Sequence, residues 1–339
     1  MMDSLKVLTG YPDAMLGCHA REVHDILGGP SLFFLEGRRA PPLFITCLQH
    51  GNEPSGFEAV QMILRKYRAG TLPRSVWLFV ANTRAAAEGK RLVVGQQDYN
   101  RCWPGTMVPD GKEIQLLQEV VDTVCRTPIF ASVDLHNNTG QNPHYGCVNR
   151  LDHSFLQLAT LFSRTVVYFT QPCGVQSLAM SEYTPSVTLE CGKVGDRVAL
   201  DHAVTFLDAC LHLHHIPDQK VQAQDIHLLQ TKATVKVVAG TTFGFGGTAN
   251  QVNFRQDIDL HNFGSIPAGS VIAKIKPGVP MPLCVTNNHG TQITEDFFRI
   301  EGGALKANRS FIPSMASTDV DVVRQDCLFY VMEELALPS

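Results

Sequence analysis

Dense runs of Lys and Arg are missing from this 339-residue sequence, and its formal net charge is −4. Nothing in it therefore indicates binding to nucleic acid or to an anionic membrane surface. Long apolar runs are also missing, because no stretch approaches the ~20 apolar residues of a membrane-spanning helix. We expect no nucleic-acid and no membrane partner. A small molecule is the expected partner, and a homo-oligomer is left open.

CxxC pairs are absent as well, although the chain has ten cysteines. Scattered cysteines without such pairs are typical of a reduced protein rather than of a disulfide framework. The N-terminal residues lack the charged-then-apolar layout of a signal peptide. We therefore expect a reduced, cytoplasmic protein.

Short apolar runs alternate with helical periodicity over the first two thirds of the chain. The predicted strands are Leu43 to Gln49, Val76 to Ala81, Ile129 to Leu135, Val166 to Phe169 and Val187 to Glu190. The predicted helices contain Phe57, Val60, Ile63 and Tyr67, then Ile114, Leu117, Val121 and Val124, then residues 197–215. Ser55, followed three residues later by Glu58, reads as a capping box that starts the first helix. This alternation predicts an α/β fold with helices on both faces of a sheet.

The pattern changes after Pro217. The polar segment DQKVQAQD predicts a linker, and from Thr231 onward the chain shows β-type alternation, glycines and prolines. We therefore expect a larger α/β domain at residues 1–217 and a smaller β-rich domain at residues 225–339.

The stretch LFITCLQHGNEPSG, residues 43–56, reads as a buried strand that ends in His50 and Glu53. In open α/β sheets, ligands bind beyond the carboxyl ends of the strands. An imidazole and a carboxylate are both zinc ligands, although an HxxE tetrapeptide also occurs by chance. His136 ends a second strand in IFASVDLHNNTG and supplies a third ligand, while Asp134 either orients a ligand or caps a turn. The sequence thus predicts one Zn²⁺ per chain, bound by His50, Glu53 and His136.

Two further strand ends carry polar side chains. Asn100 and Arg101 place a neutral donor beside a fixed cation, a pair suited to a substrate carboxylate or an oxyanion. Glu190 ends another strand, where a carboxylate that is not a ligand can accept and return a proton. His144 and Tyr145 follow the third predicted ligand, and they either line the pocket or order the loop.

At these residues the sequence resembles the succinylglutamate desuccinylase/aspartoacylase family of zinc-dependent, carboxypeptidase-like hydrolases. The matching segments, in the family's order, are HGNE, NTRAAAEGKRLVVGQQDYNRCWPG, DLHNNTGQNPHY and TLECGK. The resemblance implies a carboxypeptidase-like α/β/α sandwich with a mixed sheet, followed by a β domain that partly covers the active-site mouth. It implies zinc ligands at His50, Glu53 and His136, a catalytic carboxylate at Glu190, and substrate anchors at Asn100 and Arg101.

The resemblance also implies an arginine that polarises the scissile carbonyl. Arg91 is the candidate, with Arg84 as the rival, because the spacing from Arg91 to Asn100 is longer than in aspartoacylases. Aspartoacylases carry another arginine before the catalytic glutamate, where it binds the second carboxylate of N-acetylaspartate. Here the corresponding segment, GVQSLAMSEYTPSVTLE, has no Arg or Lys and contains Glu182. A doubly acidic substrate is therefore not expected.

These residues predict a zinc-dependent amidohydrolase that removes the acyl group from a small N-acyl amino acid or a related amide bearing a carboxylate. Two alternatives remain, a zinc carboxypeptidase acting on short peptides and a zinc-containing protein that binds a ligand without turnover. The metal-like HLHH at residues 212–215 lies at a predicted helix C-terminus, where histidine is favoured, so we expect a structural role for it.

Overall fold

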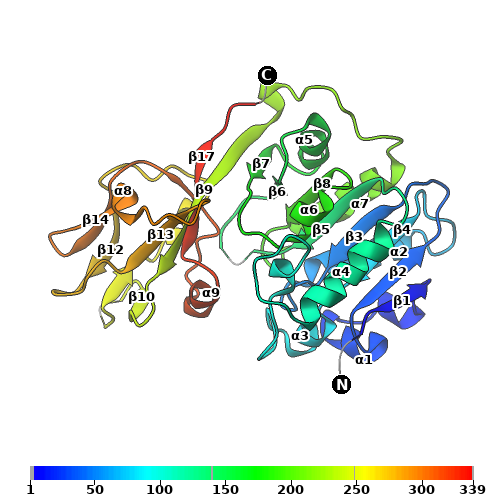
Figure 1. Cartoon of the computed structure of the whole chain (residues 1–339), viewed down its shortest axis with the longest axis horizontal. Helices are drawn as coiled ribbons and strands as arrows, with labels where there is room; N and C mark the ends of the chain where they lie inside the picture. The colour runs from blue at the N-terminus through cyan, green and yellow to red at the C-terminus, as the bar shows by residue number, and fades with distance from the viewer. Residues whose placement is uncertain (1–3, 139, 248, 338–339) are drawn as a thin grey trace. The chain divides into compact units, whose positions relative to one another are not determined.

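The computed structural model describes residues 4–138, 140–247 and 249–337, which form two compact units (Figure 1). Among these residues, the larger unit comprises 4–137, 144–228 and 337, and the smaller unit comprises 138, 140–143 and the described part of 229–336. The sequence predicts the boundary between residues 217 and 225. The predicted cover of the active-site mouth by the smaller unit stays a prediction.

The larger unit contains a mixed sheet. Its strands, in spatial order, are β1 Lys6–Thr9, β2 Ser31–Leu35, β4 Val76–Val80, β3 Leu43–Cys47, β5 Ala131–His136, β8 Ser186–Glu190, β6 Tyr145–Val148 and β7 Thr165–Tyr168. Its helices are α1 Val23–Leu27, α2 Ser55–Lys66, α3 Thr83–Glu88, α4 Lys112–Val124, α5 His153–Thr160, α6 Gln176–Met180 and α7 Arg197–His212. The pairs β2–β4 and β6–β8 are antiparallel, whereas β3, β4, β5 and β8 run parallel to one another.

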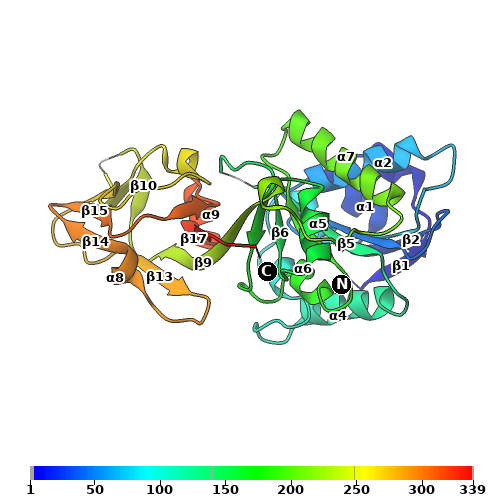
Figure 2. The ribbon, with the colours of Figure 1, turned by 90° about the horizontal axis from the view of Figure 1, so that it is seen from above.

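Helices cover both faces of this sheet, with α2 and α7 on one side and α4 and α6 on the other (Figure 2). Successive strand residues point to opposite faces, so Phe44 packs with the α4 face while Ile45 packs beneath α2 and α7. Parallel strands that helices cover on both sides are fully buried, so these strands carry apolar side chains on both faces of the sheet. The predicted α/β/α sandwich with a mixed sheet is confirmed.

Helix α2 begins differently from the prediction. Pro54 occupies the N-cap without a side-chain hydrogen bond, and Ser55 is already the first helical residue, so the predicted capping box is wrong. Asn137 replaces it, since its Oδ1 accepts from the Ser55 N–H at 3.1 Å and its Nδ2 donates to the Ser55 hydroxyl at 3.0 Å. A Cβ on Gly56 would lie 2.6 Å from the Leu135 Cβ, so only glycine allows α2 to approach β5 this closely.

The smaller unit is rich in strands, as expected. Most of β9 His227–Val237, together with β13 Leu283–Asn287, β17 Phe329–Glu334 and β16 Ile312–Ser314, pairs antiparallel. A five-stranded sheet follows the order β10 Phe243–Phe245, β11 Val252–Phe254, β12 Val271–Ile275, β15 Ala304–Ala307 and β14 Phe298–Glu301. The short helices α8 Thr294–Phe297 and α9 Val320–Gln325 complete the unit, which has an apolar core of its own. In the described part of the chain, no helix is both long and apolar enough to cross a membrane.

Candidate metal centre

The predicted site residues converge at one edge of the larger unit's sheet. Strands β3, β5 and β8 are parallel, so their carboxyl ends meet there, and the antiparallel β6 begins at the same edge. His136 and Glu190 are the last residues of β5 and β8, and they are paired in register. Tyr145, the first residue of β6, pairs with Glu190 from the other side. Paired residues point to the same face, so these three side chains are neighbours.

His50, Glu53 and His136 form a compact buried cluster. One Glu53 oxygen lies 2.8 Å from His50 Nδ1, and the other lies 2.8 Å from His136 Nδ1. One ligand atom from each of the three residues lies within 4.8 Å of the other two. Among the described residues, this is the only such grouping of three or more His, Cys, Asp or Glu side chains.

The turn after β3 explains how His50 reaches this cluster. Leu48 is buried and has a φ of 57°, the left-handed region that non-glycine residues seldom adopt. This turn takes the chain out of the strand, so that Gln49 and His50 both point toward the buried site. Gly51 follows because a Cβ there would lie 2.0 Å from the Ala85 backbone of α3. The glycine of HGNE is therefore required by the close packing of this turn on α3.

Each histidine of the cluster has a carboxylate behind it. His50 Nε2 lies 3.1 Å from Asp98 Oδ1, and His136 Nε2 lies 2.9 Å from Asp134 Oδ2. A carboxylate at Nε2 holds the proton on that nitrogen and leaves the Nδ1 lone pair for a metal. This geometry supports the orienting role, rather than the turn-capping role, for Asp134.

Charge pairing shifts the protonation of these groups. Burial alone would raise the pKa of Glu53, but the imidazoles of His50 and His136 hold it well below its usual range. Burial would lower the pKa of His136, yet Asp134 and Glu53 raise it well above its usual value. The carboxylates around the two imidazoles thus favour positive charge at this position.

Glu190 differs from these carboxylates because no cationic side chain of the described residues is bonded to it. Its Oε2 is buried and has no hydrogen-bond partner among the described residues. Burial raises the pKa of the Glu190 carboxyl to about 7, against the lowering effect of the His136 imidazole. A carboxylate with an unused oxygen and a pKa near neutrality is suited to transferring a proton.

Arg91 lies at the site, whereas its rival Arg84 is exposed on α3. The Arg91 Nη1 is 3.9 Å from a Glu53 oxygen, and its Nε and Nη2 both donate to Asp98 Oδ2, at 3.2 Å and 2.9 Å. Burial would raise the pKa of Asp98, but His50 and Arg91 hold it well below its usual range.

Asn100 and Arg101 end the 3₁₀ turn Tyr99–Arg101. The Asn100 Oδ1 accepts from Gln49 Nε2 at 3.3 Å and from the Gln176 N–H at 3.1 Å, which turns its Nδ2 toward His136 Nε2 at 3.3 Å. In the tautomer that leaves Nδ1 free for a metal, His136 Nε2 carries the proton and donates it to Asp134. This nitrogen then cannot accept a hydrogen bond from Asn100, so the Asn100 amide hydrogens remain available for a ligand. Arg101 is half-buried, and its Nη1 donates to the Asn100 carbonyl at 2.7 Å.

Three further residues that the sequence singles out lie outside the His50–Glu53–His136 cluster. The His144 ring stacks on His202 of α7, with centroids 5.2 Å apart, so packing explains its position and its substrate role stays a prediction. Glu182 is exposed in the turn before β8, at the end of the strand opposite to Glu190, so it does not face the site. His212 ends α7 and bonds the Tyr67 hydroxyl at 2.9 Å, which agrees with a structural role.

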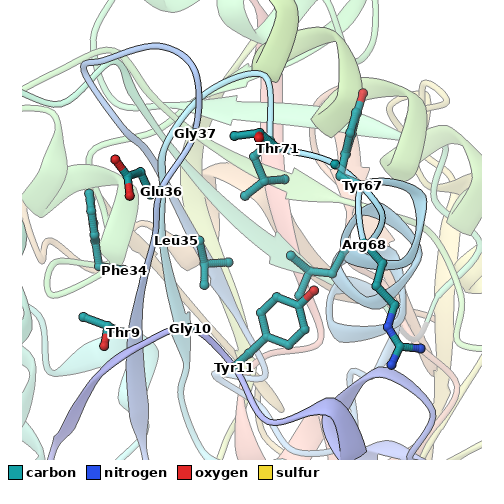
Figure 3. A pocket seen from close by; sticks show the side chains of 13 residues that line it. Thr9, Gly10, Tyr11, Phe34, Leu35, Glu36, Gly37, Tyr67, Arg68 and Thr71 are labelled. Carbon is teal, nitrogen blue, oxygen red and sulfur yellow. The ribbon is translucent and has the colours of Figure 1, made fainter.

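A separate hollow of about 680 Å³ lies at the opposite edge of the sheet (Figure 3). Figure 3 shows Tyr11, Glu36 and Arg68 around it, next to the ends of β1, β2 and α2. Because β2 is antiparallel to β4, its carboxyl end points away from the metal-ligand cluster. None of the predicted site residues lines this hollow.

Sequence reasoning missed Asp98, Gln49 and Trp103. Asp98 stands two residues before Asn100 in GQQDYNRCWPG, and this closeness to a predicted substrate anchor could have marked it as a site residue. Gln49 and Trp103 are separated by 54 positions, and no local pattern connects them.

Comparison with known proteins agrees with this architecture. The family model for the succinylglutamate desuccinylase/aspartoacylase catalytic domain matches residues 39–215, which include every predicted site residue. The chain belongs to this family of hydrolases. A search of the curated proteins found no match.

Solved structures share the fold at low sequence identity. The succinylglutamate desuccinylase from Chromobacterium violaceum is 19% identical, with a TM-score of 0.58, covering 89% of this chain and 87% of that one. The succinylglutamate desuccinylase/aspartoacylase from Rhodobacter sphaeroides is 18% identical, with a TM-score of 0.58 and coverage of 89% and 88%. Murine aminoacylase 3 is 15% identical, with a TM-score of 0.54 and coverage of 88% and 97%.

Proposed function

We propose that this protein is a zinc-dependent deacylase that hydrolyses the amide bond of a small N-acyl amino acid or a related amide bearing a carboxylate. The observation that carries the proposal is the His50–Glu53–His136 cluster with Glu190 paired beside it. Two imidazoles and one carboxylate form a ligand set typical of a catalytic zinc, which leaves one coordination position open. A buried oxygen of Glu190, to which no described residue donates a hydrogen bond, is consistent with a neighbouring site that binds a further group.

The donor atoms present fit zinc. His50 Nδ1, His136 Nδ1 and a Glu53 oxygen would hold the ion, and Asp98 and Asp134 would keep the two rings oriented. A zinc ion bound there would supply Lewis-acid chemistry, which activates a water for attack on an acyl carbonyl.

The side chains of this chain would perform the remaining steps. Glu190 accepts a proton from the attacking water and returns it to the nitrogen of the departing amine. The Arg91 guanidinium, which lies beside Glu53, offers positive charge to the oxyanion that develops on the carbonyl. The Asn100 amide and the Arg101 guanidinium hold a substrate carboxylate, and Tyr145 borders the same site.

Two other functions remain as competitors. A carboxypeptidase acting on short peptides would use the same metal and the same base, so only its substrate differs. A zinc protein that binds without turnover would need no base, and the raised pKa of Glu190 near 7 favours catalysis over binding alone.

A hydrolysis screen tests the proposal. Purified protein is supplied with zinc and incubated with N-acyl derivatives of neutral and acidic amino acids and with dipeptides, and the released amine is measured. The expected result is release from N-acyl amino acids that stops with a chelator and returns with added zinc. Release from dipeptides alone would support the carboxypeptidase, and no release from any compound would support the binding protein.

A further inference from the structure

Behind His136 lies a buried chain of hydrogen bonds that begins at Gln49. The Gln49 Nε2 donates to Asp134 Oδ2 at 2.6 Å, and its Oε1 accepts from the Trp103 indole N–H at 2.6 Å. Gln49 is 1% exposed, and Asp134 and Trp103 are fully buried. Water therefore does not compete for these bonds, and each broken bond would leave a buried polar group without a partner.

The chemistry of the two partners fixes the orientation of the Gln49 amide. An indole N–H can only donate, so the amide oxygen must face Trp103. The ionised carboxylate of Asp134 can only accept, so the amide nitrogen must face it. The amide is thus held from both ends, and a flipped amide would place two acceptors together at one end and two donors at the other.

Asp134 depends on this amide. Its Oδ2 accepts from both Gln49 and His136, while its Oδ1 is buried without a hydrogen-bond partner in the described part of the chain. Gln49 therefore supplies one of the two hydrogen bonds that this buried carboxylate accepts from the side chains of the described residues. Without it, Asp134 would be free to rotate, and the His136 ring that it orients would lose its fixed direction.

We propose that Gln49 is a positioning residue for the metal centre: it fixes the Asp134 carboxylate, and through it the His136 ring, while Trp103 holds the Gln49 amide in place. This inference rests on the proposed zinc site. The same Gln49 nitrogen also lies 3.3 Å from Asn100 Oδ1, so the amide ties the ligand histidine to the predicted substrate anchor.

The two ligand histidines are thus supported in different ways. Asp98 behind His50 is neutralised by the cationic, partly exposed Arg91, whereas Asp134 behind His136 is held by a neutral, buried amide. Replacing Gln49 with an apolar residue changes no charge at the site. A loss of metal affinity would therefore not come from a change in net charge.

The experiment replaces Gln49 with Leu, which has a similar volume and no polar atoms. Zinc affinity is measured by competition with a chromophoric chelator, in the absence of substrate. Removal of an outer partner of a metal ligand typically weakens metal binding about 10- to 100-fold, and for Gln49, one bond further out, we expect about tenfold.

Gln61→Leu is the matched control. Gln61 is also buried, at 4% exposure, and its Nε2 donates to the carbonyls of Met15 at 2.6 Å and Cys18 at 2.9 Å. We expect this variant to lower the melting temperature and to leave zinc affinity unchanged. If both variants lose zinc affinity equally, the effect of Gln49→Leu comes from general destabilisation of the protein, and the inference is overturned.

A double-mutant cycle tests the route through Asp134. In an Asp134→Asn background, Gln49→Leu should cost little further affinity, because the carboxylate that it orients is already gone. Fully additive losses would overturn the proposed route. If Gln49→Leu does not fold, Trp103→Phe is the substitute variant. It removes the indole N–H but keeps an aromatic ring between Phe44 and Phe79. Unchanged zinc affinity in Trp103→Phe would equally contradict the inference.

The outcomes separate this inference from the proposed function. Zinc affinity is measured without substrate, so wild-type protein that binds zinc but hydrolyses nothing would contradict the proposed activity alone. Unchanged affinity of Gln49→Leu, with an active wild type, would contradict the role of Gln49 alone. Wild-type protein that binds no zinc would contradict both.

Discussion

Arg91 binds Asp98 through two nitrogen atoms, with Nε at 3.2 Å and Nη2 at 2.9 Å from the same carboxylate oxygen. The other oxygen of Asp98 faces His50 Nε2 at 3.1 Å. The arginine predicted to polarise a carbonyl therefore also supports a predicted metal ligand. Changes at Arg91 would affect metal binding and catalysis together, so Asp98 is the cleaner position for a test of metal support.

Asp98→Asn is expected to weaken zinc binding about 10- to 100-fold, because an amide holds the His50 ring less firmly than a carboxylate does. Chelator competition measures this affinity. Asp152→Asn is the control, since Asp152 also pairs with an arginine, Arg150, but at the surface, where such pairs contribute little. Unaltered zinc affinity in Asp98→Asn would exclude Asp98 from the metal centre.

The zinc content of the protein should depend on the histidines of the cluster and on no other histidine. Purified wild-type protein is expected to hold about one zinc per chain, and His50→Ala or His136→Ala should lose it. His214→Ala should retain it, because His214 is exposed beyond α7 and its carbonyl is the group that faces Arg74, at 3.5 Å. Elemental analysis decides between these outcomes, and equal zinc in all variants would refute the ligand assignment.

Glu190→Gln is expected to separate binding from turnover. The amide keeps the shape of the side chain but cannot accept a proton, so kcat should fall at least about a hundredfold while zinc content persists. Substrate affinity, measured by calorimetry on this slow variant, should stay close to that of the wild type. Near-normal kcat would remove Glu190 from the mechanism.

Gly51→Ala is expected to be strongly destabilising. The added Cβ would lie 2.0 Å from the Ala85 backbone, and overpacking of this kind costs about 1–3 kcal/mol or more. Gly70→Ala is the control, because a Cβ there meets nothing within 4 Å. Urea denaturation of both variants gives the comparison, and equal stability would show that the turn after β3 adapts to a side chain.

The sequence predicted the strands that carry the site better than the strands that flank them. β3, β5 and β8 are buried on both faces and read as apolar runs, and the polar residue that follows or ends each run marked the edge of the sheet. β1, β2 and β6 were not predicted: β1 is exposed throughout and β6 is interrupted by Gly146, whereas β2 is a buried apolar run that was overlooked. Short strands take their stability from pairing with neighbours, which local patterns do not encode.

The hydrogen bonds that support the site residues could not be predicted from the sequence, for a related reason. Gln49 meets Asp134 across 85 positions and Trp103 across 54, and nothing in the spacing of these residues brings them together. The capping box at Ser55 failed in the same way, since the tertiary contact from Asn137, 82 positions away, replaced the local bond. Long-range hydrogen bonds of this kind follow from the fold and not from the local sequence.

Substrate preference is expected to favour one carboxylate over two. Helix α6 and the turn to β8 contain no Arg or Lys, so the cation that aspartoacylases carry before the catalytic glutamate has no counterpart in this segment. Glu182 adds no repulsion, because it is exposed at the far end of β8. The expected discrimination therefore comes from the missing cation alone.

N-acetylmethionine and N-acetyl-leucine should then be hydrolysed with a higher kcat/KM than N-acetylaspartate. One unpaired carboxylate should weaken transition-state binding by about 1–3 kcal/mol, or about 5- to 150-fold in kcat/KM. Cations of the smaller unit are the alternative source of a second anchor. Arg255 there already pairs with Asp257 at 2.6 Å, and Arg299 donates to Asn308 at 2.8 Å, which leaves the exposed Lys274 as the remaining candidate of the three. A clear preference for N-acetylaspartate would contradict the inference, and loss of that preference in Lys274→Met would identify the second anchor.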